Sequence, residues 1–171
     1  MNVDWLKDNN IGGSVSGLDD PIRWSDPRCV SVCAGADLFD EALDDQHIAR
    51  VFAVMAAASH HRFEVSTTRP NRMRALVSSA VFRTLVDGIV STWSASRSGV
   101  LPTVSWPLPN VYLGVEIATQ READTMVATL ASTPAAARFV RVRSAGPIDL
   151  RLPAAVSAES DCPQGMAVLS W

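Results

Sequence analysis

Short apolar runs alternate along the chain with longer segments of helical periodicity. Each run is rich in Val, Ile and other residues that favour extended backbone, and turn-forming residues bound it, which is typical of a buried strand. Four strands are predicted, at residues 29–34, 62–67, 111–117 and 138–142. Because helical segments separate them, the strands are expected to pair in parallel through right-handed crossovers.

The segments between the strands carry apolar residues at helical spacing. Asp44 and Asp45 are suited to cap a first helix, whose apolar stripe is Ile48, Val51, Phe52 and Met55. A second helix starts at Pro70, is interrupted at Ser78–Ser79, and continues with Val81, Leu85, Ile89 and Trp93. After a loop at 94–109, a capping box of Thr119 and Glu122 starts the last helix, with a stripe of Ala123, Met126, Val127 and Leu130.

This order of elements predicts an α/β fold of parallel β/α units. An eight-stranded barrel of such units usually needs roughly 250 residues, and this chain has 171. The units are therefore expected to form a partial (half) TIM-type barrel or an open sheet. The polar, Gly- and Ser-rich residues 1–17 are interpreted as a flexible lead-in, and residues 18–171 as a single α/β domain.

Composition excludes several classes of function. The formal net charge of −3 is too small and of the wrong sign for a general nucleic-acid or membrane binder. No window approaches the roughly 18 apolar residues of a membrane helix, and residues 1–10 contain no apolar run, so no signal peptide is predicted. We expect a cytoplasmic protein that does not bind membranes.

Charge is unevenly distributed along the chain. Residues 1–50 hold four basic and ten acidic side chains, whereas residues 51–100 hold six Arg against Glu64 and Asp87. The basic middle either marks an anion site or consists of Arg side chains that solvate helix faces and pair with the acidic first third.

The three cysteines do not indicate a metal site or a disulfide framework. Cys29 and Cys33 would lie about 13 Å apart in one strand, which is too far to share a metal. Cys162 is distant in sequence, and the three His lack ligand-like spacing with the cysteines. We interpret Cys29 and Cys33 as small core residues and predict no metal.

Ligands of parallel α/β proteins bind at the carboxyl ends of the strands. The pattern places there Asp37, residues 67–72 and 116–119, and Arg143 with Ser144. The candidate ligand-binding residues among them are Asp37, Thr67, Thr68, Arg69, Arg72 and Glu116. Several of them surround the start of the helix at Pro70, where backbone N–H groups and the helix dipole favour a phosphate or carboxylate. In the alternative interpretation, Arg69 pairs with Asp37 or Glu116 and only holds the rim together.

No catalytic residue is predicted. Asp37 and Glu116 are the only candidate acid/base pair at the strand ends. Neither a nucleophile motif nor a Gly-rich phosphate loop accompanies them.

A series of short motifs resembles the phage-associated three-Cys-motif proteins, a radical-SAM-like family. The matching stretches include Asp-Pro-Ile-Arg-Trp (20–24), Gly-Ala-Asp-Leu-Phe (35–39), Thr-Arg-Pro-Asn-Arg-Met (68–73) and Trp-Pro-Leu-Pro-Asn-Val-Tyr-Leu-Gly-Val (106–115). They run in the family's order over about 130 residues of the chain. The resemblance implies an α/β fold, a phage or prophage origin, and radical-SAM chemistry with an iron–sulfur cluster held by Cys thiolates.

The chain departs from the family where that chemistry would be carried. Residues 1–17 hold no Cys, Thr68 stands where the family has Lys, and no Glu-Pro pair follows residue 142. The chain also stops at Trp171, before the family's Gly-Gly-Glu-Ser-Gly strand end. We therefore expect a truncated, non-catalytic relative without a cofactor that binds an anionic ligand or a partner. The alternative is a radical-SAM-type enzyme acting on nucleic acid, with its cluster-binding segment lost or supplied in trans.

A half barrel is expected to have exposed surfaces that another part of the chain or another chain must cover. Cutting a parallel sheet leaves two hydrogen-bonding edges and an apolar inner face open. A homo-oligomer or a partner protein is expected to cover them, unless residues 1–27 and 152–171 fold back. Nucleic acid is a further, less favoured partner.

Overall fold

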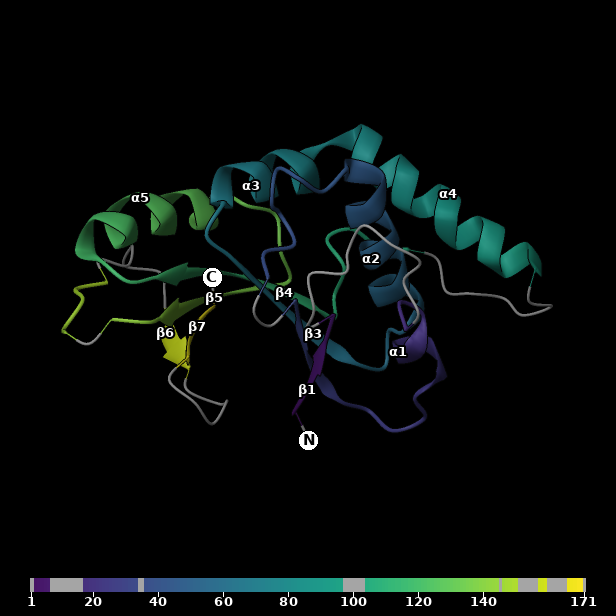
Figure 1. The fold of residues 1–171 in the computed structure, drawn as a ribbon, viewed down its shortest axis with the longest axis horizontal. Helices are drawn as coiled ribbons and strands as arrows, with labels where there is room; N and C mark the ends of the chain where they lie inside the picture. The colour runs from purple at the N-terminus through teal and green to yellow at the C-terminus, as the bar shows by residue number, and fades with distance from the viewer. Residues whose placement is uncertain are drawn as a thin grey trace.

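The computed structural model contains one sheet with helices on one side of it (Figure 1). It describes residues 2–6, 17–33, 36–96, 104–144, 146–150, 157–159 and 166–170. In these residues the sheet has seven strands in the order β1-β2-β3-β4-β5-β7-β6. The strands are β1 (Asn2–Trp5), β2 (Cys29–Val32), β3 (Arg62–Thr67), β4 (Val111–Ile117), β5 (Ala137–Val142), β6 (Ser157–Glu159) and β7 (Met166–Ser170).

The α/β class and the parallel pairing are confirmed. Strands β2 to β5, which correspond to the four predicted strands, pair in parallel and in chain order. Strands β3 and β4 have the predicted bounds. Three strands were not predicted: β1 pairs in parallel with β2, β7 is antiparallel to β5, and β6 is antiparallel to β7.

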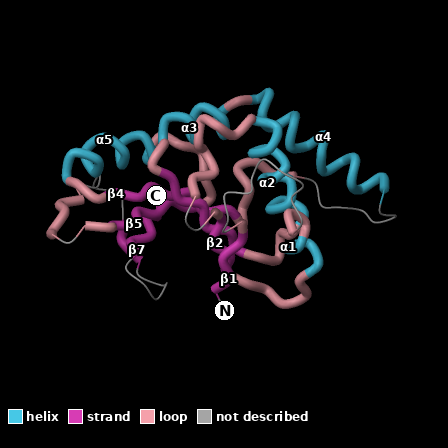
Figure 2. Tube along the Cα trace, in the orientation of Figure 1, coloured by secondary structure: helices cyan, strands magenta, loops and turns pink. Residues whose placement is uncertain are grey.

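The longer helices pack over one face of the sheet (Figures 1 and 2). The helices are α1 (Asp20–Arg23), α2 (Asp45–Ala57), α3 (Pro70–Ser78), α4 (Ala80–Ser96) and α5 (Gln120–Ala131). The predicted stripe of α2 is fully buried, and Asp44 caps this helix by accepting a hydrogen bond from the His47 N–H. No single helix among the described residues is long and apolar enough to cross a membrane.

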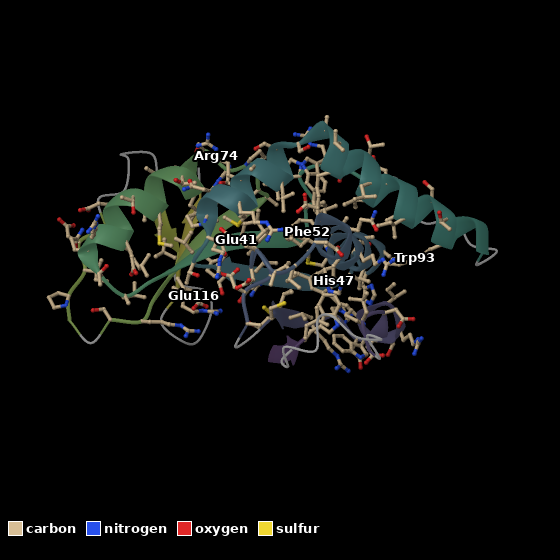
Figure 3. All side chains as sticks on the ribbon, turned by 45° about the horizontal axis from the view of Figure 1, so that its top comes forward. Glu41, His47, Phe52, Arg74, Trp93 and Glu116 are labelled. Atoms are coloured by element: carbon tan, nitrogen blue, oxygen red, sulfur yellow. The ribbon has the colours of Figure 1, made fainter. Side chains whose placement is uncertain are left out.

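The predicted stripe of α4 is confirmed in part: Leu85, Ile89 and Trp93 are half-buried against the core, but Val81 is not. Val81 is 80% exposed, and the buried stripe is Phe82, Val86 and Val90. Phe82 packs against Phe52 of α2 and against Trp106, with ring centroids 5.4 and 6.1 Å apart. Because this aromatic cluster buries more apolar area than Val81 could, it sets the rotation of the helix. Figure 3 labels Phe52. The helix also extends to Ser96, into the predicted loop.

Part of the predicted lead-in belongs to the sheet. Residues 2–5 form β1, and Trp5 is buried at 5% exposure. The Trp5 indole N–H donates to the Gly17 carbonyl at 3.1 Å. Trp5 also packs against Phe63 of β3. Burial of this one large aromatic side chain accounts for a strand that the polar composition of the segment did not indicate. Residues 7–16 lie outside the described residues.

Strands of the same chain cover both edges of the four-strand sheet. β1 pairs with the outer edge of β2, and β7 pairs with the outer edge of β5. The edges move outward to β1 and β6, which have only four and three residues. Short edge strands offer little template for pairing with another chain. Oligomeric state stays a prediction, but open edges no longer support it.

The inner face of the sheet, opposite the helices, is polar rather than apolar as expected. Side chains alternate between the faces of a strand, and registered partners share a face. The register therefore places on the inner face the side chains of Cys29, Ser31, Arg62, Glu64, Ser66, Tyr112, Glu116 and Arg141, and, between them, Gly114 and the buried Phe139. Parallel sheets usually bury apolar side chains on both faces. The charged side chains here are compensated within the sheet, since Arg62 pairs with Glu64 and Arg141 pairs with Glu116.

The predicted capping box of α5 is present. Thr119 accepts from the Glu122 N–H, and the Glu122 carboxylate accepts from the Thr119 N–H. We expect Thr119→Ala to lower the free energy of unfolding by about 1 kcal/mol, because it leaves an N-terminal N–H unsatisfied. Urea unfolding measures this, with Thr125→Ala on the exposed face of α5 as the control. Equal losses for the two variants would contradict the role of the cap.

Candidate functional site

A polar pocket of about 360 Å³ lies at the carboxyl ends of β3 and β4. Its lining residues are Ala36, Asp37, Asp40, Ser66, Thr67, Thr68, Glu116 and Arg143. Four of the six predicted site residues line it, namely Asp37, Thr67, Thr68 and Glu116. The loop after β2 supplies Asp37, β3 and the residue after it supply the two Thr, and β4 supplies Glu116. Figure 3 labels Glu116.

Asp37 is the centre of a dense hydrogen-bond network. Its Oδ1 accepts from the Phe39 N–H at 3.0 Å and from the Thr67 hydroxyl at 2.7 Å. Its Oδ2 accepts from the Thr68 N–H and hydroxyl, both at 2.9 Å, and from Arg69 Nη1 at 3.3 Å. A carboxylate that accepts this many donors has little capacity left for a ligand.

The network keeps Asp37 ionised. Burial raises the pKa of this carboxyl, but the hydrogen bonds from Thr67, Thr68 and Phe39 outweigh burial and leave the pKa below its usual value of 3.8. A depressed pKa makes Asp37 a poor proton donor or acceptor near neutral pH.

Asp37 occupies the position that was predicted for an external anion. Its carboxylate bonds the Thr68 N–H directly before α3, while Arg69 contacts both Asp37 and Asp40 at 3.3 and 2.8 Å. The dipole of α3 and the charge of Arg69 are thus compensated by carboxylates of the same chain. This agrees with the alternative interpretation, in which Arg69 pairs with an acidic residue and holds the rim together. The partners of Arg69 are Asp37 and Asp40, not Glu116.

Arg72 lies outside the pocket lining and braces the loop after β2. It donates to the carbonyls of Asp40 and Leu43, and pairs with Asp45 at 3.0 Å. Because Arg72 joins α3 to the loop that carries Asp37, it positions the pocket wall. These contacts leave the guanidinium directed at the loop.

Glu116 belongs to a second cluster that includes residues sequence reasoning did not select. Its Oε1 accepts from the Ser66 hydroxyl at 2.7 Å and from Arg141 Nη1 at 3.1 Å. Its Oε2 lies 2.7 Å from Arg143 Nε. The sequence pattern had placed Arg143 at the strand ends without selecting it. Alternation could have added Arg141, which lies two residues earlier and therefore on the same face of the sheet.

Asp37 and Glu116 line one pocket but belong to separate networks. No hydrogen bond between them occurs among the described contacts, and each carboxylate is held by at least three donors. This arrangement does not favour the acid/base pair that sequence reasoning considered.

The two described cysteines, Cys29 and Cys33, are free thiols. Burial raises the pKa of Cys29 to about 11 and of Cys33 to about 12, so both stay protonated at neutral pH. Cys33 is a core residue as predicted, whereas Cys29 on the inner face donates to Glu64 at 3.1 Å. The described residues contain no group of three or more His, Cys, Asp or Glu that could hold a metal ion. Cys162 lies outside them.

Comparison with known proteins identifies one family. The model of a family described as "Protein of unknown function (DUF5131)" matches residues 5–151, which includes every residue of the pocket. No curated protein and no solved structure matches this chain.

Proposed function

We propose that this chain, which belongs to the DUF5131 family of proteins of unknown function, is a non-catalytic protein that binds a small anionic ligand in the pocket at the carboxyl ends of β3 and β4. The observation that carries the proposal is the state of Arg143. Its side chain is 60% exposed, and its Nε lies 2.7 Å from Glu116 Oε2. Its two terminal nitrogens have no partner among the described residues.

Arg143 differs in this respect from the other arginines of the rim. Arg69 is held between two carboxylates, and Arg72 is held by loop carbonyls and Asp45. A guanidinium with free terminal nitrogens can bind a phosphate or carboxylate with two parallel hydrogen bonds. Glu116 orients the guanidinium through Nε, and Thr68, whose hydroxyl donates to Asp37, also lines the pocket.

Binding without catalysis fits the other groups of the pocket. The pKa of Asp37 is lowered rather than raised toward neutrality, and Glu116 is held by Ser66, Arg141 and Arg143. The pocket therefore offers a fixed, polar surface. The radical-SAM-type activity, its action on nucleic acid, and the phage origin stay predictions. Anaerobic reconstitution with iron and sulfide, followed by absorption spectroscopy, tests the radical-SAM-type activity, because a bound iron–sulfur cluster absorbs visible light.

We also propose that the sheet is part of a TIM-type barrel. Two observations support this: β1 to β5 follow chain order in space, and helices α2 to α5 lie on one face (Figure 2). Doubly wound open sheets, in contrast, carry helices on both faces. A partial barrel would place the pocket at the carboxyl-terminal rim, where ligands of this architecture bind.

The test of ligand binding is a titration of the ¹⁵N-labelled chain with inorganic phosphate. We expect the side-chain Nε–H resonance of Arg143 and the Thr68 amide to shift. Arg143→Gln should weaken binding by about 10- to 100-fold, which corresponds to the loss of one or two charge-assisted hydrogen bonds.

Arg50→Gln is the matched control, because Arg50 is exposed on α2. This substitution removes the same charge at a position away from the pocket. The proposal is contradicted if Arg143→Gln binds phosphate as the wild type does, or if both variants lose affinity equally. Equal loss would indicate a general charge effect rather than a site.

A further inference from the structure

Two histidines attach the segment 17–28, here called the strap, to the body of the domain. The strap contains α1 and lies against the end of α2 and the start of β3 (Figure 1). His61 Nε2 is 2.9 Å from the Pro21 carbonyl, and the Arg28 N–H donates to His61 Nδ1 at 3.2 Å. His60 Nε2 is 2.7 Å from the Trp24 carbonyl. The strap lies at the amino ends of β2 and β3, opposite the pocket.

The partners of His61 fix its protonation state. Nδ1 faces a backbone N–H, so it must be an unprotonated acceptor, and Nε2 faces a carbonyl, so it must carry the proton. The ring is therefore neutral. It is 1% exposed and packs between Trp24 and Phe63, with ring centroids 5.6 and 6.1 Å away. A second proton could go only on Nδ1, where it would replace an attraction by a contact between two donors.

The charged groups around His61 also oppose its protonation. The His60 ring lies 3.9 Å away, and the Arg28 guanidinium stacks on Trp24 at 4.9 Å. On the strap, Asp19 and Asp20 pair with Arg23. The last turn of α2 contains no basic side chain, and Arg62 of β3 pairs with Glu64 on the inner face. Burial, His60 and Arg28 together hold the pKa of His61 below its usual 6.5, against the hydrogen bond with Pro21.

We propose that His61 is a proton-sensitive latch that releases the strap from α2 and β3 when its Nδ1 is protonated. Release removes the bond to Arg28 and exposes Trp24 and the buried side of Pro21. It also loosens β1, because Gly17 of the strap accepts the indole N–H of Trp5. The hydrogen-bonding edge of β2 is then uncovered. This inference is independent of ligand binding in the pocket.

The direction of the pH effect follows from the difference in proton affinity. With the strap released, His61 is solvated and binds a proton near pH 6.5, whereas with the strap attached it binds one only at lower pH. Acid therefore favours release. Between the two pH values at which the attached and the released forms bind the proton, the equilibrium constant for release should rise about tenfold for each unit by which the pH falls.

Hydrogen–deuterium exchange at pH 7.5 and 5.5, corrected for intrinsic rates, tests the latch on the full chain. We expect protection of strap peptides to fall at the lower pH, by up to about tenfold, while peptides from β4 keep theirs. His61→Gln, which has no titratable ring, should abolish this pH dependence. His60→Gln is the matched control. It loses one strap bond at both pH values but should retain a pH dependence, because His61 still carries the titrating ring.

Unchanged strap protection in the wild type, or a pH dependence that persists in His61→Gln, would overturn the proposal. Should His61→Gln fail to fold, ¹⁵N chemical shifts of the wild-type imidazole decide it. The latch requires the neutral Nε2–H tautomer at pH 7.5 and release coincident with protonation of His61. The other tautomer, or release without protonation, excludes the latch.

Discussion

Replacing Asp37 with Asn should lower the free energy of unfolding by about 3 kcal/mol, a large fraction of the stability of a domain of this size. The side chain is 14% exposed and accepts from five donors on the loop after β2, on β3 and on the start of α3. Asn retains one acceptor oxygen, but its amide group would face either Thr67 and Phe39, or Thr68 and Arg69. In the first orientation the part-buried donors of Thr67 and Phe39 lose their partner, and in the second the more exposed donors of Thr68 and Arg69 lose theirs.

The loss should depend on pH in a defined direction. Because the pKa of Asp37 is lower in the folded chain than its usual 3.8, its contribution is fully present above that value. As the pH falls through the lowered pKa, the wild-type carboxylate is protonated and the contribution disappears. The difference between wild type and Asp37→Asn should therefore be complete at pH 7 and shrink below pH 3.8.

Urea unfolding at both ends of that range measures the effect. Asp40→Asn is the matched control, because Asp40 also pairs with Arg69 but its side chain is 40% exposed. Its loss should stay below about 1 kcal/mol, as expected for a solvent-screened ion pair. Losses of similar size in the two variants, or a loss for Asp37→Asn that does not change in acid, would show that the network is not the source of stability.

Periodicity in the sequence was sufficient for the elements whose core contacts are local. β3, β4 and the capping box of α5 follow the predicted bounds, because each has its own apolar pattern and its own cap. β1, β6 and β7 have three to five residues each. Segments this short pair only because a sheet is already there to receive them, and no local pattern indicates that.

The site illustrates a different limit. Sequence reasoning brought Asp37, Thr67, Thr68 and Arg69 to one rim, and the structure places them together. It could not decide whether the anion beside α3 is external or internal, because a chain's own carboxylate satisfies the same donors as a phosphate. Arg143 was also brought to this rim but was not selected as a site residue, and Arg141 was not considered, because their partner Glu116 is on another strand.

The polar inner face was missed for a related reason. Alternating residues of β3 and β4, such as Arg62, Glu64 and Glu116, are polar in the sequence. A half barrel was nevertheless expected to have an apolar interior, by analogy with closed barrels. Arg62 and Glu64 compensate each other within β3, whereas Glu116 of β4 is compensated by Arg141 of β5. Pairing between strands distant in sequence is not visible in single-strand patterns.

Replacing Gly114 with Ala should be nearly as damaging as the loss of Asp37, with a cost of about 2–3 kcal/mol from overpacking. Gly114 of β4 is in register with Phe139 of β5 on the inner face. A Cβ at this position would lie under 3.0 Å from three atoms of the Phe139 ring. The ring is 1% exposed and carries the Arg141 guanidinium 5.8 Å above it, so it has little room to move.

The overlap with Phe139 should also disturb the pocket. Moving Phe139 displaces Arg141, which holds Glu116, and Glu116 in turn orients Arg143. Gly114→Ala should therefore weaken phosphate binding as well as stability. Shortening the ring in the double variant Gly114→Ala/Phe139→Leu should relieve the overlap, with an interaction energy of about 1 kcal/mol or more in a double-mutant cycle.

Gly88→Ala is the control for the glycine substitution itself. A Cβ at Gly88 of α4 meets nothing within 4 Å, so this variant should gain about 0.5–1 kcal/mol from helix propensity. Urea unfolding is measured for the wild type, Gly114→Ala, Phe139→Leu, the double variant and Gly88→Ala. The comparison distinguishes a specific overlap with Phe139 from a general intolerance of added methyl groups. An additive cycle would place the cost of Gly114→Ala in the β4 backbone rather than in Phe139. The coupling from Phe139 through Arg141 and Glu116 to Arg143 would then be excluded as the route to the pocket.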